Sequence, residues 1–200
     1  MHDMTHGNAF VRDEIAKTGA LLEAMHADPA IIAMVEKVAE QCVVAIRRGN
    51  KVLFAGNGGS AADAQHLAAE LVGKLAYDRP GLPSISLTTD TSVLTAIGND
   101  YGFEDVFRRQ IEAVAVKGDV LIGLSTSGRS KNILKAFLAS REKGIFTIGM
   151  TGATGGDMLA LCDLCLRVPS LETQKIQEGH IVLGHIFCGL VERMMFPRGL

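Results

Sequence analysis

Two helical stretches of the sequence carry imidazole and carboxylate side chains among apolar neighbours. His66 and Glu70 are four residues apart, so on a helix they project from the same face, one turn apart. In the later stretch, Gln177 and His185 differ by about 80° around a helix, whereas His180 and His185 differ by about 140°. Imidazole and carboxylate groups bind zinc and transfer protons, while a glutamine oxygen is an unusual ligand. The spacing indicates a shared site for His66, Glu70, Gln177 and His185, with a solvated His66–Glu70 pair as the alternative.

A loop rich in hydroxyl groups indicates a second kind of chemistry. The segment Ser125-Thr126-Ser127-Gly128-Arg129-Ser130 follows an apolar run and precedes a helical pattern. Hydroxyls and backbone N–H groups at a helix N-terminus supply donors for a dianionic phosphate without a lysine. The alternative is an ordinary helix cap with solvated hydroxyls, but four hydroxyls in six residues favour a phosphate site.

A glycine-rich loop, Gly56-Asn57-Gly58-Gly59-Ser60-Ala61, loosely matches the dinucleotide-binding pattern. A nicotinamide enzyme would also need an acidic residue at the end of the second strand, about 20 residues on. The sequence has Tyr77-Asp78-Arg79-Pro80 there, before the next strand, which disfavours nicotinamide binding. The glycines are better explained by close approach of the backbone to a sugar. The spacing of Ser60 and Asp63 predicts a capping box at the start of the following helix.

Short apolar runs alternate with helical patterns along the rest of the chain, which predicts a parallel sheet covered on both faces. Residues 8–49 read as two helices with a break at Asp28-Pro29, and residues 172–195 read as the last helix. We therefore expect one doubly wound, five-stranded α/β domain over residues 1–200, in which helices in residues 1–49 extend a core of residues 50–200. Ligands of such sheets sit beyond the carboxyl ends of the strands. The five expected strands are residues 51–55, 84–87, 119–124, 145–150 and 164–168.

The composition excludes several classes of protein. Of 200 residues, 48% are apolar and 21% charged, which is typical of a globular chain rather than a disordered one. A net charge of −2 argues against a nucleic-acid-coating protein. Without a long apolar run or a signal peptide, we expect a soluble cytoplasmic protein with no membrane or nucleic-acid partner. We expect the four cysteines to be reduced packing residues, including the isolated C-x-x-C pair, Cys162 and Cys165.

Four motifs together resemble the sugar isomerase (SIS) domain family, in particular its phosphoheptose isomerase branch. They are residues 56–66 (GNGGSAADAQH), 99–102 (NDYG), 125–128 (STSG) and 177–180 (QEGH), and the resemblance covers nearly the whole chain. It implies a flavodoxin-like fold and a homotetramer with active sites at the subunit interfaces and one Zn²⁺ per subunit. It also implies an isomerase that interconverts sedoheptulose 7-phosphate and D-glycero-D-manno-heptose 7-phosphate through an enediol. That reaction begins bacterial ADP- or GDP-heptose synthesis for lipopolysaccharide or capsule.

The resemblance also implies roles for individual residues. The metal ligands would be His66, Glu70, Gln177 and His185, and Glu70 and His185 would also move the protons. The remaining substrate contacts would fall on two further groups, Asn57, Gly58, Gly59, Asn99 and Asp100 for the sugar and Ser125, Thr126, Ser127 and Ser130 for the phosphate. Glu70 and Gln177 would also touch the substrate.

Two other functions are compatible with the same fold. One branch of the SIS family is a non-catalytic protein that binds a replication initiator, and such a binder would not need all four proposed metal ligands. The presence of all four here favours the enzyme. A SIS isomerase acting on another sugar phosphate is the second alternative, because the sequence does not define the length of the pocket.

Overall fold

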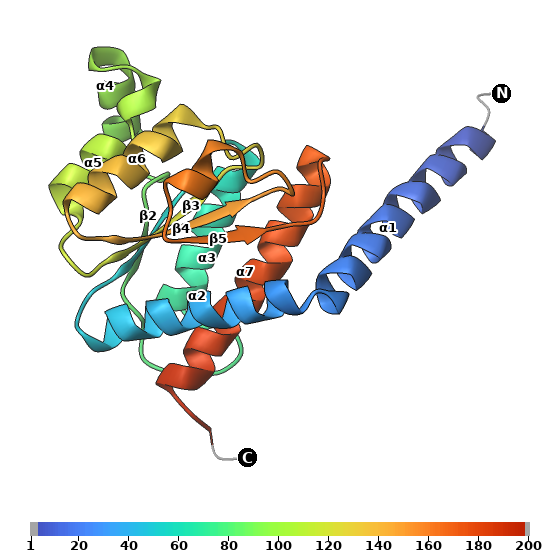
Figure 1. Ribbon diagram of the computed structural model, residues 1–200, viewed down its shortest axis with the longest axis horizontal. Coiled ribbons are helices and arrows are strands. Elements are labelled where there is room, and N and C mark those ends of the chain that lie inside the picture. The colour runs from blue at the N-terminus through green and yellow to red at the C-terminus, as the bar shows by residue number, and fades with distance from the viewer. Residues whose placement is uncertain (1–3, 199–200) are drawn as a thin grey trace.

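The computed structural model describes residues 4–198 and is built around a five-stranded parallel sheet (Figure 1). The strand order is β2-β1-β3-β4-β5, and every neighbouring pair is parallel. All residues of β1 and β3 are buried, which is why these strands read as continuous apolar runs. The predicted five-stranded, doubly wound sheet is confirmed. Its strands are β1 (Val52–Ala55), β2 (Ser84–Ser86), β3 (Val120–Leu124), β4 (Phe146–Thr151) and β5 (Leu164–Arg167).

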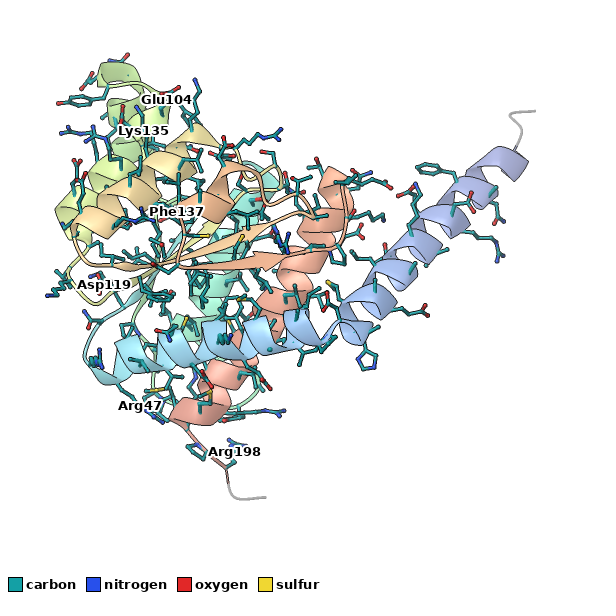
Figure 2. All side chains as sticks on the ribbon, in the orientation of Figure 1. Arg47, Glu104, Asp119, Lys135, Phe137 and Arg198 are labelled. Atoms are coloured by element: carbon teal, nitrogen blue, oxygen red, sulfur yellow. The ribbon has the colours of Figure 1, made fainter. Side chains whose placement is uncertain are left out.

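Helices cover both faces of the sheet and form two apolar cores. Along β1, Val52 and Phe54 face the core shared with α2 (Pro29–Arg47), α3 (Gly59–Val72) and α7 (Thr173–Met195). The alternate side chains, Leu53 and Ala55, face the core of the second layer, which contains α5 (Arg108–Val114) and α6 (Lys131–Glu142). Phe137 points from α6 toward the sheet and is fully buried there (Figure 2). A short helix, η2 (Gly156–Ala160), lies between β4 and β5.

The N-terminal helices behave differently from each other. Asp28 caps α2 by accepting a hydrogen bond from the N–H of Ala30 at 2.8 Å, as the Asp28-Pro29 break predicts. Helix α2 packs on the core, whereas α1 (Met4–Ala27) extends away from the sheet (Figure 1). The contact of α1 with α7 includes Lys175, whose ammonium donates to the Glu14 carbonyl at 3.1 Å and to Thr18 Oγ1 at 2.9 Å.

Four further observations bear on the sequence predictions. The predicted capping box is wrong: α3 begins at Gly59, its N-cap Gly58 has φ +57°, and no side chain caps it. Helix α4 (Thr91–Asp100), which packs on η1 (Phe103–Asp105), and helix α5 were not predicted. All four cysteines are free thiols, Cys42 and Cys188 buried and the C-x-x-C pair partly exposed. Within residues 4–198, no helix is long and apolar enough to cross a membrane.

Candidate functional site

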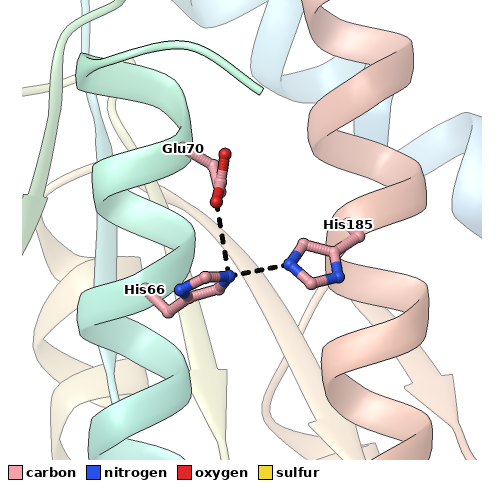
Figure 3. Close-up of side chains that lie close together, drawn as sticks. All are labelled: His66, Glu70 and His185. Carbon is pink, nitrogen blue, oxygen red and sulfur yellow. Dashed lines mark hydrogen bonds and ion pairs between the residues drawn. The ribbon is translucent and has the colours of Figure 1, made fainter. Parts of the chain in front are cut away.

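Three of the predicted metal-binding side chains meet between α3 and α7 (Figure 3). The Nε2 atoms of His66 and His185 are 2.7 Å apart, and His66 Nε2 is 3.3 Å from Glu70 Oε1. The two rings meet edge to face, with their centroids 4.9 Å apart. The His66 side chain is 47% exposed and that of Glu70 18%, so the cluster is open to solvent on one side.

A glycine on α7 lets the two helices approach closely enough for these side chains to meet. Gly184 precedes His185 and faces α3, where a Cβ would lie 2.6 Å from a methyl group of Leu67. A larger residue at position 184 would therefore have to displace the buried Leu67 side chain or move α7, and with it His185, away from α3.

The chemistry and spacing of the cluster fit a metal ion. One ligand atom from each of His66, Glu70 and His185 lies within 4.8 Å of the others. Two ligands of a tetrahedral zinc ion at about 2.0–2.1 Å are roughly 3.4 Å apart, so small side-chain adjustments would place all three around one ion. Three protein ligands and one open position are also the usual arrangement of a catalytic zinc site. Without metal, the two imidazoles can share a hydrogen bond, in which one Nε2 donates and the other accepts.

Gln177, the fourth ligand implied by the resemblance, lies away from the cluster, toward the N-terminal ends of α3 and α7. It is eight residues before His185, which corresponds to about 12 Å along α7. Its amide lies against Gly59 at the start of α3, where a Cβ would be 2.6 Å from Gln177 Nε2. The structure therefore places Gln177 beside the glycine-rich loop, two turns before His66.

The serine loop has the geometry of an anion site. Ser125 follows β3 directly, and its Oγ is 2.8 Å from Ser130 Oγ. The Ser127 hydroxyl accepts from the N–H of Arg129 at 3.2 Å. Ser130 is the N-cap of α6, yet its side chain makes no capping hydrogen bond. The hydroxyls thus gather above the helix N-terminus instead of serving as a cap, which is the arrangement that binds phosphate groups.

Gly128 gives the serine loop its tight shape. Its φ is +65°, a conformation that side chains disfavour, and an added Cβ would lie 2.0 Å from the carbonyl oxygen of Gly155. The loop consequently packs directly on the backbone of the segment that follows β4.

Asn132 connects the serine loop to the glycine-rich loop and was not found from the sequence. The side-chain amides of Asn57 and Asn132 exchange two hydrogen bonds, of 3.0 and 2.8 Å. Asn132 is buried and lies in the first turn of α6. No local sequence pattern signals this pairing, because the two asparagines are 75 residues apart.

Two predicted sugar contacts lie elsewhere in this chain. Asn99 and Asp100 end α4, where both are exposed and the Asn99 amide donates to the Asp100 carboxylate at 2.8 Å. Helix α4 protrudes from the body of the protein, away from α3 and α7 (Figure 1). The fold of one chain does not bring these two residues to the cluster.

His180 is separate from the site, as its position around the helix predicts. Its ring is completely buried, and neither ring nitrogen has a hydrogen-bond partner among residues 4–198. Burial lowers its pKa from 6.5 to about 4, and the backbone of Thr151 offsets only part of this shift. His180 is therefore a neutral core residue at neutral pH.

Comparison with known proteins places the chain in a family. The SIS domain family model matches residues 15–152. The phosphoheptose isomerase of Burkholderia pseudomallei (strain 1710b) is 59% identical over 189 residues, which cover 94% of this chain and 96% of that protein. The phosphoheptose isomerase 2 of Campylobacter jejuni is 51% identical over 98% of both chains. The structure of phosphoheptose isomerase GmhA from Neisseria gonorrhoeae matches with a TM-score of 0.87 and 40% identity, over 92% of this chain and 98% of that one.

The fold and these matches show that the chain belongs to the SIS domain family. Within that family, its similarity at 50–59% identity is to proteins named phosphoheptose isomerase. The resemblance that the four motifs indicate is thereby confirmed.

Proposed function

We propose that this protein is an aldose–ketose isomerase that converts sedoheptulose 7-phosphate to D-glycero-D-manno-heptose 7-phosphate. The observation that carries the proposal is the meeting of His66, Glu70 and His185 between two helices. Two groups that can move protons stand there beside a position for a metal ion. The relatives named phosphoheptose isomerase, which match nearly end to end, support the choice of substrate.

The proposed substrate-binding groups are neighbours in the fold, from the serine loop through the glycine-rich loop to α3. The phosphate binds at the serine loop, through Ser125, Thr126, Ser127 and Ser130. The Asn57–Asn132 amide pair joins that loop to Asn57, Gly58 and Gly59, where Gln177 also lies. His66 and Glu70 lie further along α3. A sugar held by its phosphate at the serine loop thus has Asn57 to Gly59 and Gln177 as its next neighbours.

The reaction needs a proton moved between C1 and C2 and another between the two oxygens, with an enediol between the two steps. Glu70 and His185 are the bases for these transfers. A Zn²⁺ ion held by His66, Glu70 and His185 would polarise the carbonyl oxygen, and Glu70 and His185 would act as bases only while released from the ion. Gln177, the fourth ligand that the resemblance implies, lies two turns away beside Gly59 in this chain, where it would contact the sugar. Isotope-exchange experiments on the variants described below assign one of Glu70 and His185 to the proton on carbon and the other to the proton on oxygen.

The direct test is to mix the purified protein with sedoheptulose 7-phosphate and follow the sugar by NMR. We expect resonances of the heptose aldose to grow until equilibrium is reached. A six-carbon ketose phosphate in a parallel tube tests for another sugar phosphate as substrate. Failure to turn over either sugar, with metal supplied, would favour the non-catalytic binding protein.

Replacing both Ser125 and Ser127 with alanine should raise the KM for the sugar phosphate. A hydrogen bond to a charged group contributes about 1.5–3 kcal/mol, so each lost hydroxyl should weaken binding about tenfold or more. Ser140→Ala is the matched control, because that buried hydroxyl lies on α6 outside the loop and has no hydrogen-bond partner among residues 4–198. Steady-state kinetics with an unchanged KM in the double variant would remove the serine loop from the site.

We also propose a homotetramer whose active sites lie at subunit interfaces, in which residues 1–49 of the SIS domain pack between subunits. Helix α1 exposes Phe10, Val11 and Ile15, and the core of its own chain leaves them uncovered. Asn99 and Asp100, on the protruding α4, reach a site only if it belongs to a neighbouring subunit. Sedimentation velocity at micromolar concentration should give a tetramer, and a monomer would contradict this assembly.

The proposed reaction also indicates a pathway and a location in the cell. The product is the sugar from which ADP- or GDP-heptose is made, so the enzyme acts at the start of bacterial heptose biosynthesis, for lipopolysaccharide or capsule. Such synthesis draws on cytoplasmic sugar phosphates, which is the basis for a cytoplasmic location.

A further inference from the structure

A buried ion pair joins the segment after α3 to the end of α7. Arg79 Nε is 3.0 Å from Glu192 Oε2, and the two side chains are only 2% and 1% exposed. The Glu192 carboxylate also accepts hydrogen bonds from the N–H groups of Leu75 and Ala76, both at 2.9 Å. Burial alone raises the pKa of Glu192, but these N–H groups and Arg79 outweigh it and lower the pKa below its usual range. The pair is therefore charged and fully partnered.

The Arg79 guanidinium holds the last turn of α3 by its backbone. It donates to the carbonyl oxygen of Glu70 at 2.7 Å and to that of Leu71 at 2.6 Å. The final carbonyl groups of a helix have no partner within the helix, and a cation there also interacts favourably with the helix dipole. One of the two carbonyls that Arg79 binds belongs to Glu70 itself.

Glu192 lies on the same face of α7 as His185. It is seven residues after His185 on α7, which is two turns further on and about 20° around the helix. A single ion pair thus connects the backbone of Glu70 on α3 to the helix face that carries His185. Gly184 lies where α7 meets Leu67 of α3, and the Arg79–Glu192 pair joins the same two helices two turns after His185.

We propose that Arg79 and Glu192 are positioning residues, which set the register of α3 against α7 and so the separation of Glu70 from His185. The proposal rests on the metal-binding and proton-transfer roles given to those two residues above. A pair with a purely structural role would contribute to folding and leave the metal site unchanged. Replacing one partner of a buried ion pair is destabilising in either case, so loss of stability does not distinguish the two roles.

The test uses Arg79→Lys and Glu192→Gln in the full-length protein. A lysine ammonium keeps the charge but cannot donate to the two carbonyls and the carboxylate in the planar geometry of a guanidinium. Glutamine keeps one oxygen to accept from the N–H groups and loses the charge. Zinc affinity is measured by competition with a chromophoric chelator, at a temperature where circular dichroism shows each variant folded. We expect zinc to bind about 10- to 100-fold more weakly, the usual loss when a partner behind a ligand is changed.

Kinetics supply the second measurement. We expect kcat to fall by about tenfold or more while KM for the sugar phosphate stays within about threefold. The reason is that the side-chain hydrogen bonds and ion pairs of Arg79 and Glu192 within residues 4–198 go to α3, to the segment 75–80 and to each other, and none goes to the serine loop that holds the phosphate. A rise in KM with kcat unchanged would contradict a role in positioning Glu70.

Asp119→Asn is the matched control. Asp119 is likewise fully buried and ion-paired, with Lys51 at 2.6 Å, and it accepts from the backbone N–H groups of Lys51 and Val116. None of these partners belongs to α3 or α7. The variant should lose stability as the Glu192 variant does, but keep the zinc affinity and kcat of the wild type.

The outcomes separate this proposal from the proposed function. Wild-type zinc affinity and kcat in both Arg79→Lys and Glu192→Gln would overturn the positioning role. If Asp119→Asn weakened zinc binding equally, the effect would be one of general stability, and the positioning role would again fail. If Glu70→Gln itself left zinc binding and turnover unchanged, the role of Glu70 in the site would fail instead.

Discussion

Glu70→Gln should lower kcat by a factor on the order of 10² to 10⁴, which is the usual contribution of a positioned general acid or base. The substitution keeps the size of the side chain and an oxygen that can bind metal, but it removes the negative charge and most of the basicity. The variant should fold normally, because a neutral amide costs less to desolvate than a carboxylate. Steady-state rates with sedoheptulose 7-phosphate, at saturating zinc, measure the effect.

Two further variants define the site around Glu70. His185→Ala should abolish turnover and also weaken zinc binding, because the imidazole is both a proposed base and one of the three clustered ligands. His180→Leu is the control on the same helix, since that ring is buried away from the cluster. Rates within threefold of wild type for Glu70→Gln and His185→Ala would leave the isomerase without its bases, and a binding protein would then be the better explanation.

The sequence predicted the sheet well, because its strands are buried on both faces. Strands such as Val120–Leu124 have every residue buried and therefore appear as uninterrupted apolar runs. The helix Thr91–Asp100 was missed although Val93, Leu94 and Ile97 recur at helical spacing, because the apolar stretch is short and none of its residues is fully buried. The capping-box prediction failed because Gly58, with its positive φ, lets the helix begin before Ser60.

The site was only partly predictable for a similar reason. His66 and Glu70 are neighbours on one helix turn, so their spacing reveals a common face. Asn132 and Glu192 have partners 75 and 113 residues away, and only the folded chain shows them. Glu192 lies in a segment where a carboxylate would ordinarily mark the solvated face of a helix, yet it is fully buried with Arg79. Pairings of this kind depend on how the helices pack, and no local pattern encodes them.

The second large effect concerns His180 and the stability of the fold in acid. Burial holds the pKa of this ring at about 4 in the folded protein, against 6.5 for an unperturbed histidine. Below pH 6.5 the unfolded chain takes up a proton that the folded chain does not, so the free energy of unfolding falls as the pH is lowered. The loss begins near pH 6.5, continues to about pH 4 and then levels off. At 1.36 kcal/mol per pKa unit, the full difference amounts to about 3 kcal/mol.

Protonation of carboxylates also lowers the free energy of unfolding in this pH range, so His180→Leu is needed to isolate the effect of the ring. Glu192 and Asp119, for example, have lowered pKa values and also lose stabilising interactions in acid. Urea unfolding at a series of pH values from 7.5 to 4.5 should show the wild type losing about 2–3 kcal/mol more than the variant. At pH 7.5 the variant should be close to the wild type in stability, since the ring is neutral there and a leucine occupies a similar buried volume without a polar group. Parallel pH curves for the two proteins would show that His180 is already accessible to protons in the folded state, and its interpretation as a neutral core residue would then be wrong.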